Sequence, residues 1–187
     1  MKNALRDLLI MMVIAVGVFV VLRTTVQTFI IYGPSMQPSF WEQQRLLVNK
    51  VVYRMHDPER FDVVIFHPPH DPSASPYIKR IIGLPGEYVE LIDGKVLIHQ
   101  PDGNVFELDE PYTNEPAKRN YKSTVIGEGE YFVLGDNRNN TNDSRNGWMA
   151  DAGAFVGKAW LSIWPPTRWG ITHNYQPPDG VASAVAD

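Results

Sequence analysis

Residues 88–99 read YVELIDGKVLIH and contain the clearest structural signal in the chain. On each side of Asp93-Gly94, apolar residues recur at every second position, which is the period of a strand with one buried face. An Asp-Gly pair between two such runs is typical of a two-residue hairpin turn, because both positions need positive φ. The stretch therefore predicts an antiparallel hairpin and favours a β-rich fold around it.

Short strand-like runs flank this hairpin on both sides. Each is rich in β-branched or aromatic residues and stops at Gly, Pro or Asp. No internal repeat and no long amphipathic helix interrupts them. We therefore expect a mainly β fold of antiparallel sheets, with further strands in Val26–Tyr32, Leu46–Tyr53, Phe61–Phe66, Tyr77–Ile82, Asn104–Leu108, Tyr131–Leu134 and Ala159–Trp164.

The N-terminal segment has a different character. Leu8–Leu22 reads LLIMMVIAVGVFVVL and carries no charge. At 1.5 Å per residue this run covers about 22 Å of a roughly 30 Å hydrocarbon core, and residues 24–26 extend it if Arg23 snorkels outward. A cleavable signal peptide would show an Ala-x-Ala-like site after the run, and a buried core helix would be apolar on one face only. We expect an uncleaved transmembrane helix over residues 8–26.

Charge predicts the orientation of this helix. Lys2 and Arg6 precede the span, which favours an N-terminus inside the cell. Residues 1–7 are then a cytoplasmic tail, and the rest lies on the extracytoplasmic side of the plasma membrane. Residues 175–187 are rich in Pro, Gly and Ala, and we expect a flexible C-terminal tail there.

Composition excludes several classes of protein. The 187 residues include 17 Lys+Arg and 21 Asp+Glu, a net charge of −4, and no cysteine. The acidic balance argues against a nucleic-acid partner, and the lack of cysteine excludes disulfides, Cys-ligated metals and thiol nucleophiles. None of the five histidines lies among turn or charge features that would hold its ring in place. His67 and His70 have no third metal ligand nearby, so we expect no metal site.

One serine and one lysine stand in positions suited to chemistry. Ser35 lies in GPSMQP, where Gly33 and two prolines make a stiff turn that exposes a hydroxyl. Strand alternation places Lys79 on one face with Tyr77 and Ile81. If that face is buried, desolvation lowers the lysine pKa; a base near neutrality needs a fall of about 3 units, roughly 4 kcal/mol. If the strand lies at an edge, Lys79 instead snorkels to water and stays charged.

Gly135–Arg145 is an uninterrupted polar stretch, GDNRNNTNDSR. It directly follows an apolar strand, and its residues suit either a solvated loop or a satisfied polar network. Its spacing is not that of a calcium-binding loop.

Taken together, the anchor and roughly residues 29–170 resemble the type I signal peptidases, the membrane-anchored Ser/Lys proteases of bacteria. The family's boxes are matched in order by Ser35–Pro38 (S-M-x-P), Phe61–Phe66 (x-D-V-V-x-F), Tyr77–Gly86 (Y-I-K-R-x-I-G-L-P-G), Gly135–Arg145 (G-D-N-R-x-N-S-x-D-S-R) and residues 164–170, its closing strand.

This resemblance implies an activity and a site. Ser35 is the nucleophile and its own N–H an oxyanion donor, Lys79 is the general base, and the substrates are exported preproteins cut after small residues. No cofactor is implied. The supporting residues are Arg80, Asp136, Arg138, Thr141, Asp143 and Arg145; the substrate strand is received by Ile31, Tyr32, Met36, Phe40, Tyr77 and Ile78.

The resemblance also implies a catalytic β domain over residues 27–174, with residues 87–126 as an inserted hairpin subdomain. Three positions depart from the family's pattern. Gly33 replaces a serine that helps bind the oxyanion in some members, which leaves the second donor unidentified. Thr141 replaces a serine that bonds the lysine, and we expect its hydroxyl to keep that role. Glu87 replaces an aspartate.

Three other functions compete with this reading. An anchored β domain that binds exported chains without cutting them explains the helix and the strands. A related family of self-cleaving Ser/Lys repressors is soluble and DNA-linked, which disagrees with the anchor and the acidic charge. A Ser-His-Asp hydrolase would need a G-x-S-x-G elbow and a placed histidine.

Overall fold

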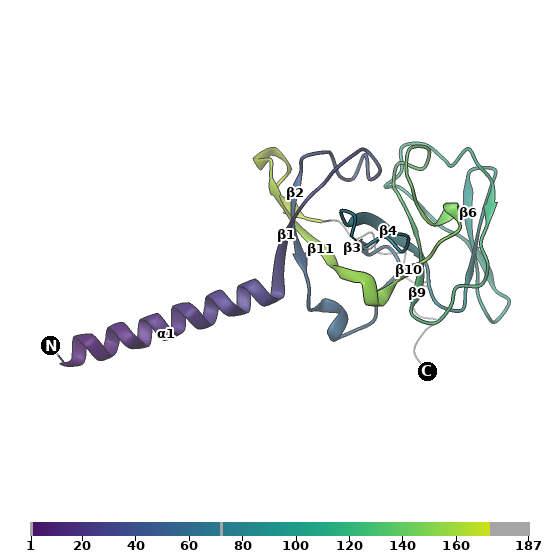
Figure 1. Cartoon of the computed structure of the whole chain (residues 1–187). Coiled ribbons are helices and arrows are strands. Elements are labelled where there is room, and N and C mark those ends of the chain that lie inside the picture. The colour runs from purple at the N-terminus through teal and green to yellow at the C-terminus, as the bar shows by residue number, and fades with distance from the viewer. Residues whose placement is uncertain (1, 72, 173–187) are drawn as a thin grey trace.

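The computed structural model describes residues 2–71 and 73–172. One long helix, α1 (Lys2–Thr25), projects from a β-rich body that contains the other described residues (Figure 1). Its stretch Arg6–Thr25 is long and apolar enough to cross a bilayer. The helix begins within the predicted N-terminal tail and ends one residue before the predicted end of the span, because Val26 already starts β1 (Val26–Ile30).

The first sheet has eight antiparallel strands. They are β1, β2 (Arg45–Asn49), β11 (Phe155–Trp164), β3 (Val63–Phe66), β4 (Tyr77–Gly83), β9 (Glu130–Leu134) and β10 (Ala150–Asp151) in spatial order, with β12 (Gly170–Ile171) paired to β11. Strand β1 therefore lies at an edge of this sheet, and β4 lies inside it between β3 and β9.

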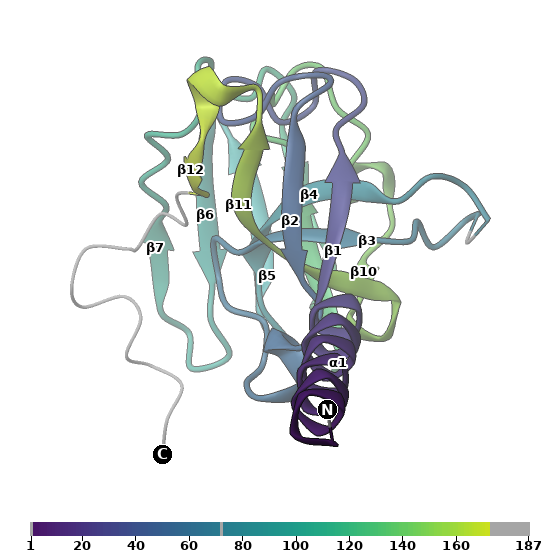
Figure 2. The ribbon, with the colours of Figure 1, turned by 90° about the vertical axis from the view of Figure 1, so that its left-hand side faces the viewer.

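The second sheet contains the predicted hairpin. Its order is β7 (Val105–Glu107), β6 (Lys95–His99), β5 (Tyr88–Ile92) and β8 (Tyr121–Lys122). Between β5 and β6, Asp93 and Gly94 have φ of 50° and 82°, and Ile92 pairs with Lys95. The two-residue turn is therefore confirmed, and Figure 2 shows β5, β6 and β7 side by side.

The core explains the position of β4. Ile82 packs in a cluster with Val89 and Ile98 of the second sheet, whereas its neighbour Ile81 packs in another cluster with Phe66 and Trp148. Strand β4 is thus buried on both faces, so Lys79 does not snorkel from an edge. The mainly β fold of antiparallel sheets is confirmed.

Several local expectations differ from the structure. The run predicted as a strand up to Tyr53 leaves the sheet at Asn49 and forms a 3₁₀ turn, η1 (Val52–Arg54). Strands β8, β10 and β12 were not predicted, because two-residue strands leave no alternating pattern to detect. The tail expected over residues 175–187 lies outside the described residues.

Candidate active site

Ser35 lies in a loop that closes on itself. The Ser35 loop, residues 31–44, leaves the end of β1 and returns to β2, and the Ile31 N–H donates to the Gln44 carbonyl while Gln43 N–H donates to that of Ile31, both at 2.9 Å. Gly33 has a φ of 78°, a conformation that glycine adopts without strain. The loop is therefore pinned at its base, and Ser35 is held near its tip.

Lys79 approaches this serine from the centre of the first sheet. Its amine donates to the Ser35 hydroxyl at 2.9 Å and to its neighbour's carbonyl, that of Ile78, at the same distance. Only 4% of Lys79 is exposed. Two residues that are 44 positions apart in the sequence thus meet, the amine buried and the serine partly exposed.

Burial sets the charge of this amine. Desolvation lowers the pKa of Lys79 from 10.5 to about 8, against the opposing effect of the Asp143 and Asp136 carboxylates. Among the described residues, Lys79 forms no ion pair that would restore its usual pKa. At pH 8 and above, a large fraction of the amine is therefore uncharged and able to accept a proton.

The polar loop, residues 135–145, holds the Ser35 loop from the other side. The Asn137 N–H donates to the Ser35 carbonyl at 3.0 Å, and its side-chain amide donates to the Pro34 carbonyl at 3.2 Å. At Gly135 an added Cβ would overlap both the Ser35 carbonyl oxygen and the Thr141 hydroxyl. Asn137 and Gly135 were not predicted as site residues, although both stand inside the polar stretch Gly135–Arg145.

Ion pairs fix the polar loop in the interior. Arg80 donates two hydrogen bonds to Asp136, at 2.9 and 2.7 Å, and Arg145 donates two to Asp143, both at 2.9 Å. All four residues are buried. The charged side chains of the stretch therefore form a paired, buried network, whereas three of its asparagines, Asn139, Asn140 and Asn142, are exposed to solvent.

A third pair joins this network to the second sheet. Arg138 donates to both oxygens of Glu110, and its Nε donates to the Gly135 carbonyl at 3.2 Å. Glu110 was not predicted as a site residue, because no local pattern marks it.

Thr141 does not make the expected bond. Within residues 2–71 and 73–172, its buried hydroxyl oxygen has no hydrogen-bond partner. The hydroxyl instead lies against Gly135. The Lys79 amine bonds Ser35 and Ile78 but not this hydroxyl, so the expectation that Thr141 orients the lysine by a direct bond is wrong.

The predicted substrate residues divide into two groups. Four of them pack in one apolar cluster: Ile31, Met36, Phe40 and Ile78. The others are accessible, with Tyr32 64% exposed and the Tyr77 ring half-buried, its centre 5.4 Å from the Lys79 amine. Their contact with a substrate stays a prediction.

A family model described as "Signal peptidase, peptidase S26" matches residues 5–164, which include the Ser35 loop, β4 and the polar loop. The chain belongs to this family. It is a peptidase that removes signal peptides, and its substrates are preproteins that carry them.

Individual relatives agree with this membership. A probable signal peptidase I-2 of Synechocystis sp. is 35% identical, with 81% of this chain and 72% of that protein covered. Signal peptidase IB of Staphylococcus aureus is 33% identical, with 95% of this chain and 97% of that protein covered. A crystal structure of a signal peptidase I from Enterococcus faecalis V583 is 32% identical with a TM-score of 0.47, covering 55% of this chain and 97% of that one.

Proposed function

We propose that this signal peptidase is a membrane-anchored serine endopeptidase in which Ser35 is the nucleophile and Lys79 the general base, and which cuts exported preproteins after small, Ala-x-Ala-like residues. The observation that carries the proposal is the 2.9 Å contact between a serine hydroxyl and a lysine amine that is almost fully buried. Nucleophile and base must lie within this reach, and the base must lose its charge near working pH.

The first step follows from the partners of the amine. In its neutral form, Lys79 keeps one N–H on the Ile78 carbonyl, which aims the lone pair at the Ser35 hydroxyl. The amine takes the hydroxyl proton as Ser35 Oγ attacks the scissile carbonyl carbon, and negative charge develops on the carbonyl oxygen. The Ser35 backbone N–H bonds that oxygen; it has no acceptor among the described residues and is free for this role.

The charged Lys79 then returns its proton to the leaving amine, and the C–N bond breaks to give an acyl-enzyme. Released from its proton, the same amine activates a water that attacks the ester. The carbonyl–Oγ bond breaks, the signal peptide leaves with a new carboxylate, and Ser35 recovers its proton. Lys79 thus serves both half-reactions without any other titrating group.

Strand pairing supports a substrate that binds in extended form. Strand β9 pairs with β4 only from Arg80 onward, so among the described strands none occupies that side of Tyr77 and Ile78. A preprotein segment laid between this edge and the Ser35 loop gains backbone hydrogen bonds, which is recognition by β-augmentation. The scissile carbonyl would then lie beside the Ser35 hydroxyl, which stays in contact with the Lys79 amine.

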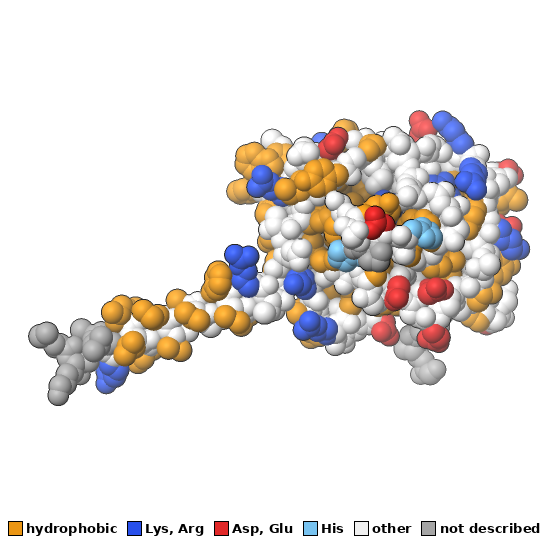
Figure 3. Space-filling model, viewed as in Figure 1, with side chains coloured by type: hydrophobic (Ala, Val, Ile, Leu, Met, Phe, Trp, Pro, Cys, Tyr) orange, Lys and Arg blue, Asp and Glu red, His pale blue; other side chains and the backbone are white. Residues whose placement is uncertain are grey.

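The helix supports a membrane anchor. Arg6–Thr25 has 20 residues, which span about 30 Å, the thickness of a hydrocarbon core. Its apolar side chains are exposed along its length (Figure 3). Because α1 continues into β1 and β1 leads to the Ser35 loop, a single-pass anchor holds the site close to the extracytoplasmic surface.

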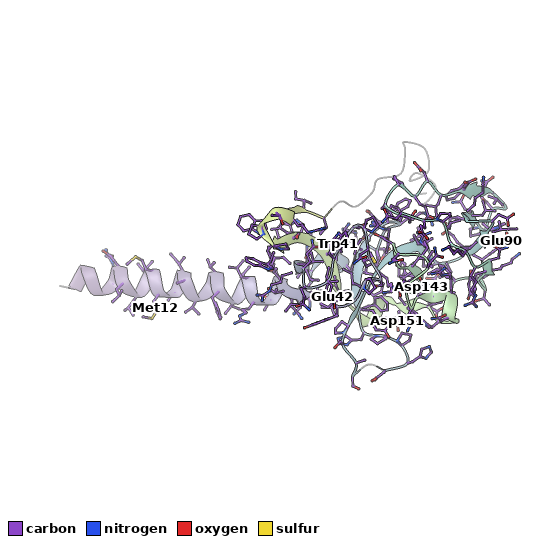
Figure 4. The ribbon with its side chains drawn as sticks, turned by 90° about the horizontal axis from the view of Figure 1, so that it is seen from above. Met12, Trp41, Glu42, Glu90, Asp143 and Asp151 are labelled. Carbon is purple, nitrogen blue, oxygen red and sulfur yellow. The ribbon has the colours of Figure 1, made fainter. Side chains whose placement is uncertain are left out.

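Aromatic residues at the same end of the body fit this arrangement. Trp41, Trp164 and Trp169 are all at least 40% exposed. Trp41 lies at the end of the body from which α1 emerges (Figure 4), with the Arg168 guanidinium 4.6 Å from its ring centre. Tryptophan is favoured at the membrane–water interface. Its neighbour Phe40 is buried in the core and does not share this position.

The test uses the full chain in detergent and a purified preprotein with an Ala-x-Ala site. Mass spectrometry of the products should show one cut after the second Ala. Ser35→Ala and Lys79→Met should abolish the cut while the protein stays folded, whereas the exposed-site controls Ser73→Ala and Lys118→Ala should cut as the parent does. Full activity of either site variant would end the assignment. Preprotein that is bound but left intact by the parent would indicate the binding domain instead.

A further inference from the structure

Two side chains of one segment reach from the second sheet into the polar loop. The segment 109–113 lies in the connection between β7 and β8 and includes Glu110 and Tyr112. Both are more than half-buried, although the segment itself has no regular structure. The burial of these two side chains therefore comes from their contacts rather than from regular structure in the segment.

Glu110 closes the network around Arg138. Its carboxylate accepts two hydrogen bonds from Arg138, both at 2.5 Å, and only 1% of the Arg138 side chain is exposed. Arg138 also donates to the Gly135 carbonyl, and Gly135 packs directly on the Ser35 backbone. Glu110 is thus three contacts away from the serine, with Arg138 and Gly135 between them.

Tyr112 closes the network around Arg80. The Arg80 guanidinium lies 4.1 Å from the centre of the Tyr112 ring, a cation–π contact, and the Tyr112 hydroxyl donates to Glu110 at 2.9 Å. Arg80 is the immediate neighbour of Lys79 on β4. The two residues therefore brace the serine side and the lysine side of the site from one segment.

The charges of this buried cluster balance only if Glu110 is counted. Three guanidinium groups face three carboxylates: Arg80, Arg138 and Arg145 against Asp136, Asp143 and Glu110. If Glu110 loses its charge, these groups hold three cations against two carboxylates. An unpaired buried charge is costly and acts over several ångströms in a medium of low dielectric constant.

We propose that Glu110 and Tyr112 are positioning residues, through which the second sheet holds the polar loop against Ser35 and keeps the charge around Lys79 balanced. As a statement about catalysis, this rests on the proposed function. As a statement about the electrostatics of Lys79, it can be measured without any substrate.

The surroundings of Lys79 give the sign of the effect. Two carboxylates, Asp136 and Asp143, act on it from the polar loop and favour its charged form. The Tyr77 ring faces it from its own strand, and its cross-strand neighbour on β3 is the apolar Val64. An extra positive charge in the polar loop offsets the two carboxylates, so it must lower the Lys79 pKa further.

The experiment compares Glu110→Gln with Glu110→Asp, which keeps the charge, and with Glu107→Gln. Glu107 lies on β7 of the same sheet in an exposed pair with Lys95, so it is a matched control. Lysines labelled with ¹³C at Cε report the Lys79 pKa by NMR titration of the full chain in detergent, and Lys79→Met identifies the signal. Cleavage kinetics are measured on the same samples.

Glu110→Gln should lower the Lys79 pKa by about 0.5 to 1 unit, the effect of one unpaired charge at an effective dielectric constant of about 20. It should lower kcat by about 10- to 100-fold and change KM less than about twofold, because the reacting groups and not the substrate are misplaced. Glu110→Asp should restore much of the Lys79 pKa and much of kcat, and Glu107→Gln should match the parent in both quantities.

A second variant keeps the proposal testable if Glu110→Gln does not fold. Tyr112→Phe keeps the ring over Arg80 but removes the bond to Glu110, and it should lower kcat by several-fold with the Lys79 pKa unchanged. An unchanged Lys79 pKa in folded Glu110→Gln, or parent-like kinetics in both variants, would overturn the inference. If the parent cuts no preprotein but the pKa still moves, the proposed function fails and the electrostatic role stands.

Discussion

Lys79 and Arg80 are adjacent on β4 and almost equally buried, 4% and 1% exposed, yet the fold accommodates their cations in opposite ways. Arg80 points to one face and meets Asp136 in a two-point ion pair, which raises its pKa. Lys79 points to the other face, without an ion pair among the described residues, and burial lowers its pKa. One strand thus supplies a permanent cation that anchors the polar loop and an amine that can be neutral.

The pH dependence of cleavage should follow the Lys79 amine. Because burial lowers its pKa to about 8, the neutral base gains population as pH rises through that value. We expect kcat/KM to rise between pH 7 and 9 and then level off. Initial rates of preprotein cleavage from pH 6 to 10 measure this, and a limb centred near pH 10 would contradict a desolvated base.

Lys79→Met should stabilise the fold while it removes activity. With a pKa of about 8 in the folded chain and 10.5 as the ordinary value, the unfolded state binds more protons between these pH values, so this group's contribution to stability rises with pH across that window. Below pH 8 the full penalty of about 3 kcal/mol applies. An apolar side chain of similar size avoids it.

Urea unfolding of the two proteins at pH 7 and at pH 10.5 tests this linkage. The stability advantage of Lys79→Met should be about 1–2 kcal/mol at pH 7, after the loss of two hydrogen bonds is subtracted, and it should shrink at the higher pH. If the greater stability of Lys79→Met were independent of pH, the desolvation of the Lys79 amine would not be its cause.

The hairpin of the second sheet could be predicted because its information is local. Asp93 and Gly94 adopt the positive φ values that their residue types tolerate, and the alternation on each side sets the register. The position of β4 could not be derived in this way. Whether Lys79 was a buried base or an edge residue depended on β9, which pairs with β4 from about 50 residues further along the chain.

The same reasoning explains which site residues were found. Ser35, Lys79 and the charged residues of the polar loop stand in contiguous motifs, so the resemblance to a family located them. Glu110 pairs with Arg138 across 28 positions and has no motif of its own. Only the folded structure shows that Glu110, which follows β7 of the second sheet, balances the charge of Arg138, which follows β9 of the first sheet.

Gly135→Ala should impair catalysis through the backbone alone. The added methyl would overlap the Ser35 carbonyl oxygen and the Thr141 hydroxyl, so the polar loop and the Ser35 loop must separate, which should disturb the contact between Ser35 and Lys79. A displacement of about 1 Å can cost on the order of 100-fold in rate, and we expect kcat/KM to fall at least tenfold. At the control position Gly127, a methyl meets only the movable carboxylate of Glu130. Equal cleavage rates for both variants would show that the loop contact does not matter.

Glu87→Gln should cost stability rather than chemistry, because Glu87 fastens the turn that joins β4 to the second sheet. Its carboxylate pairs with Arg60 at 2.6 Å and accepts the Leu84 N–H at 2.8 Å, and both charged side chains are at most 9% exposed. Removing the charge leaves Arg60 buried without its partner, which should lower the free energy of unfolding by about 3–5 kcal/mol. The exposed pair of Lys95 and Glu107 gives the comparison, since Glu107→Gln should change stability by less than about 1 kcal/mol. Urea denaturation at pH 7 measures the free energy of unfolding of both variants. If Glu87→Gln lost as little stability as Glu107→Gln, water would already reach the turn.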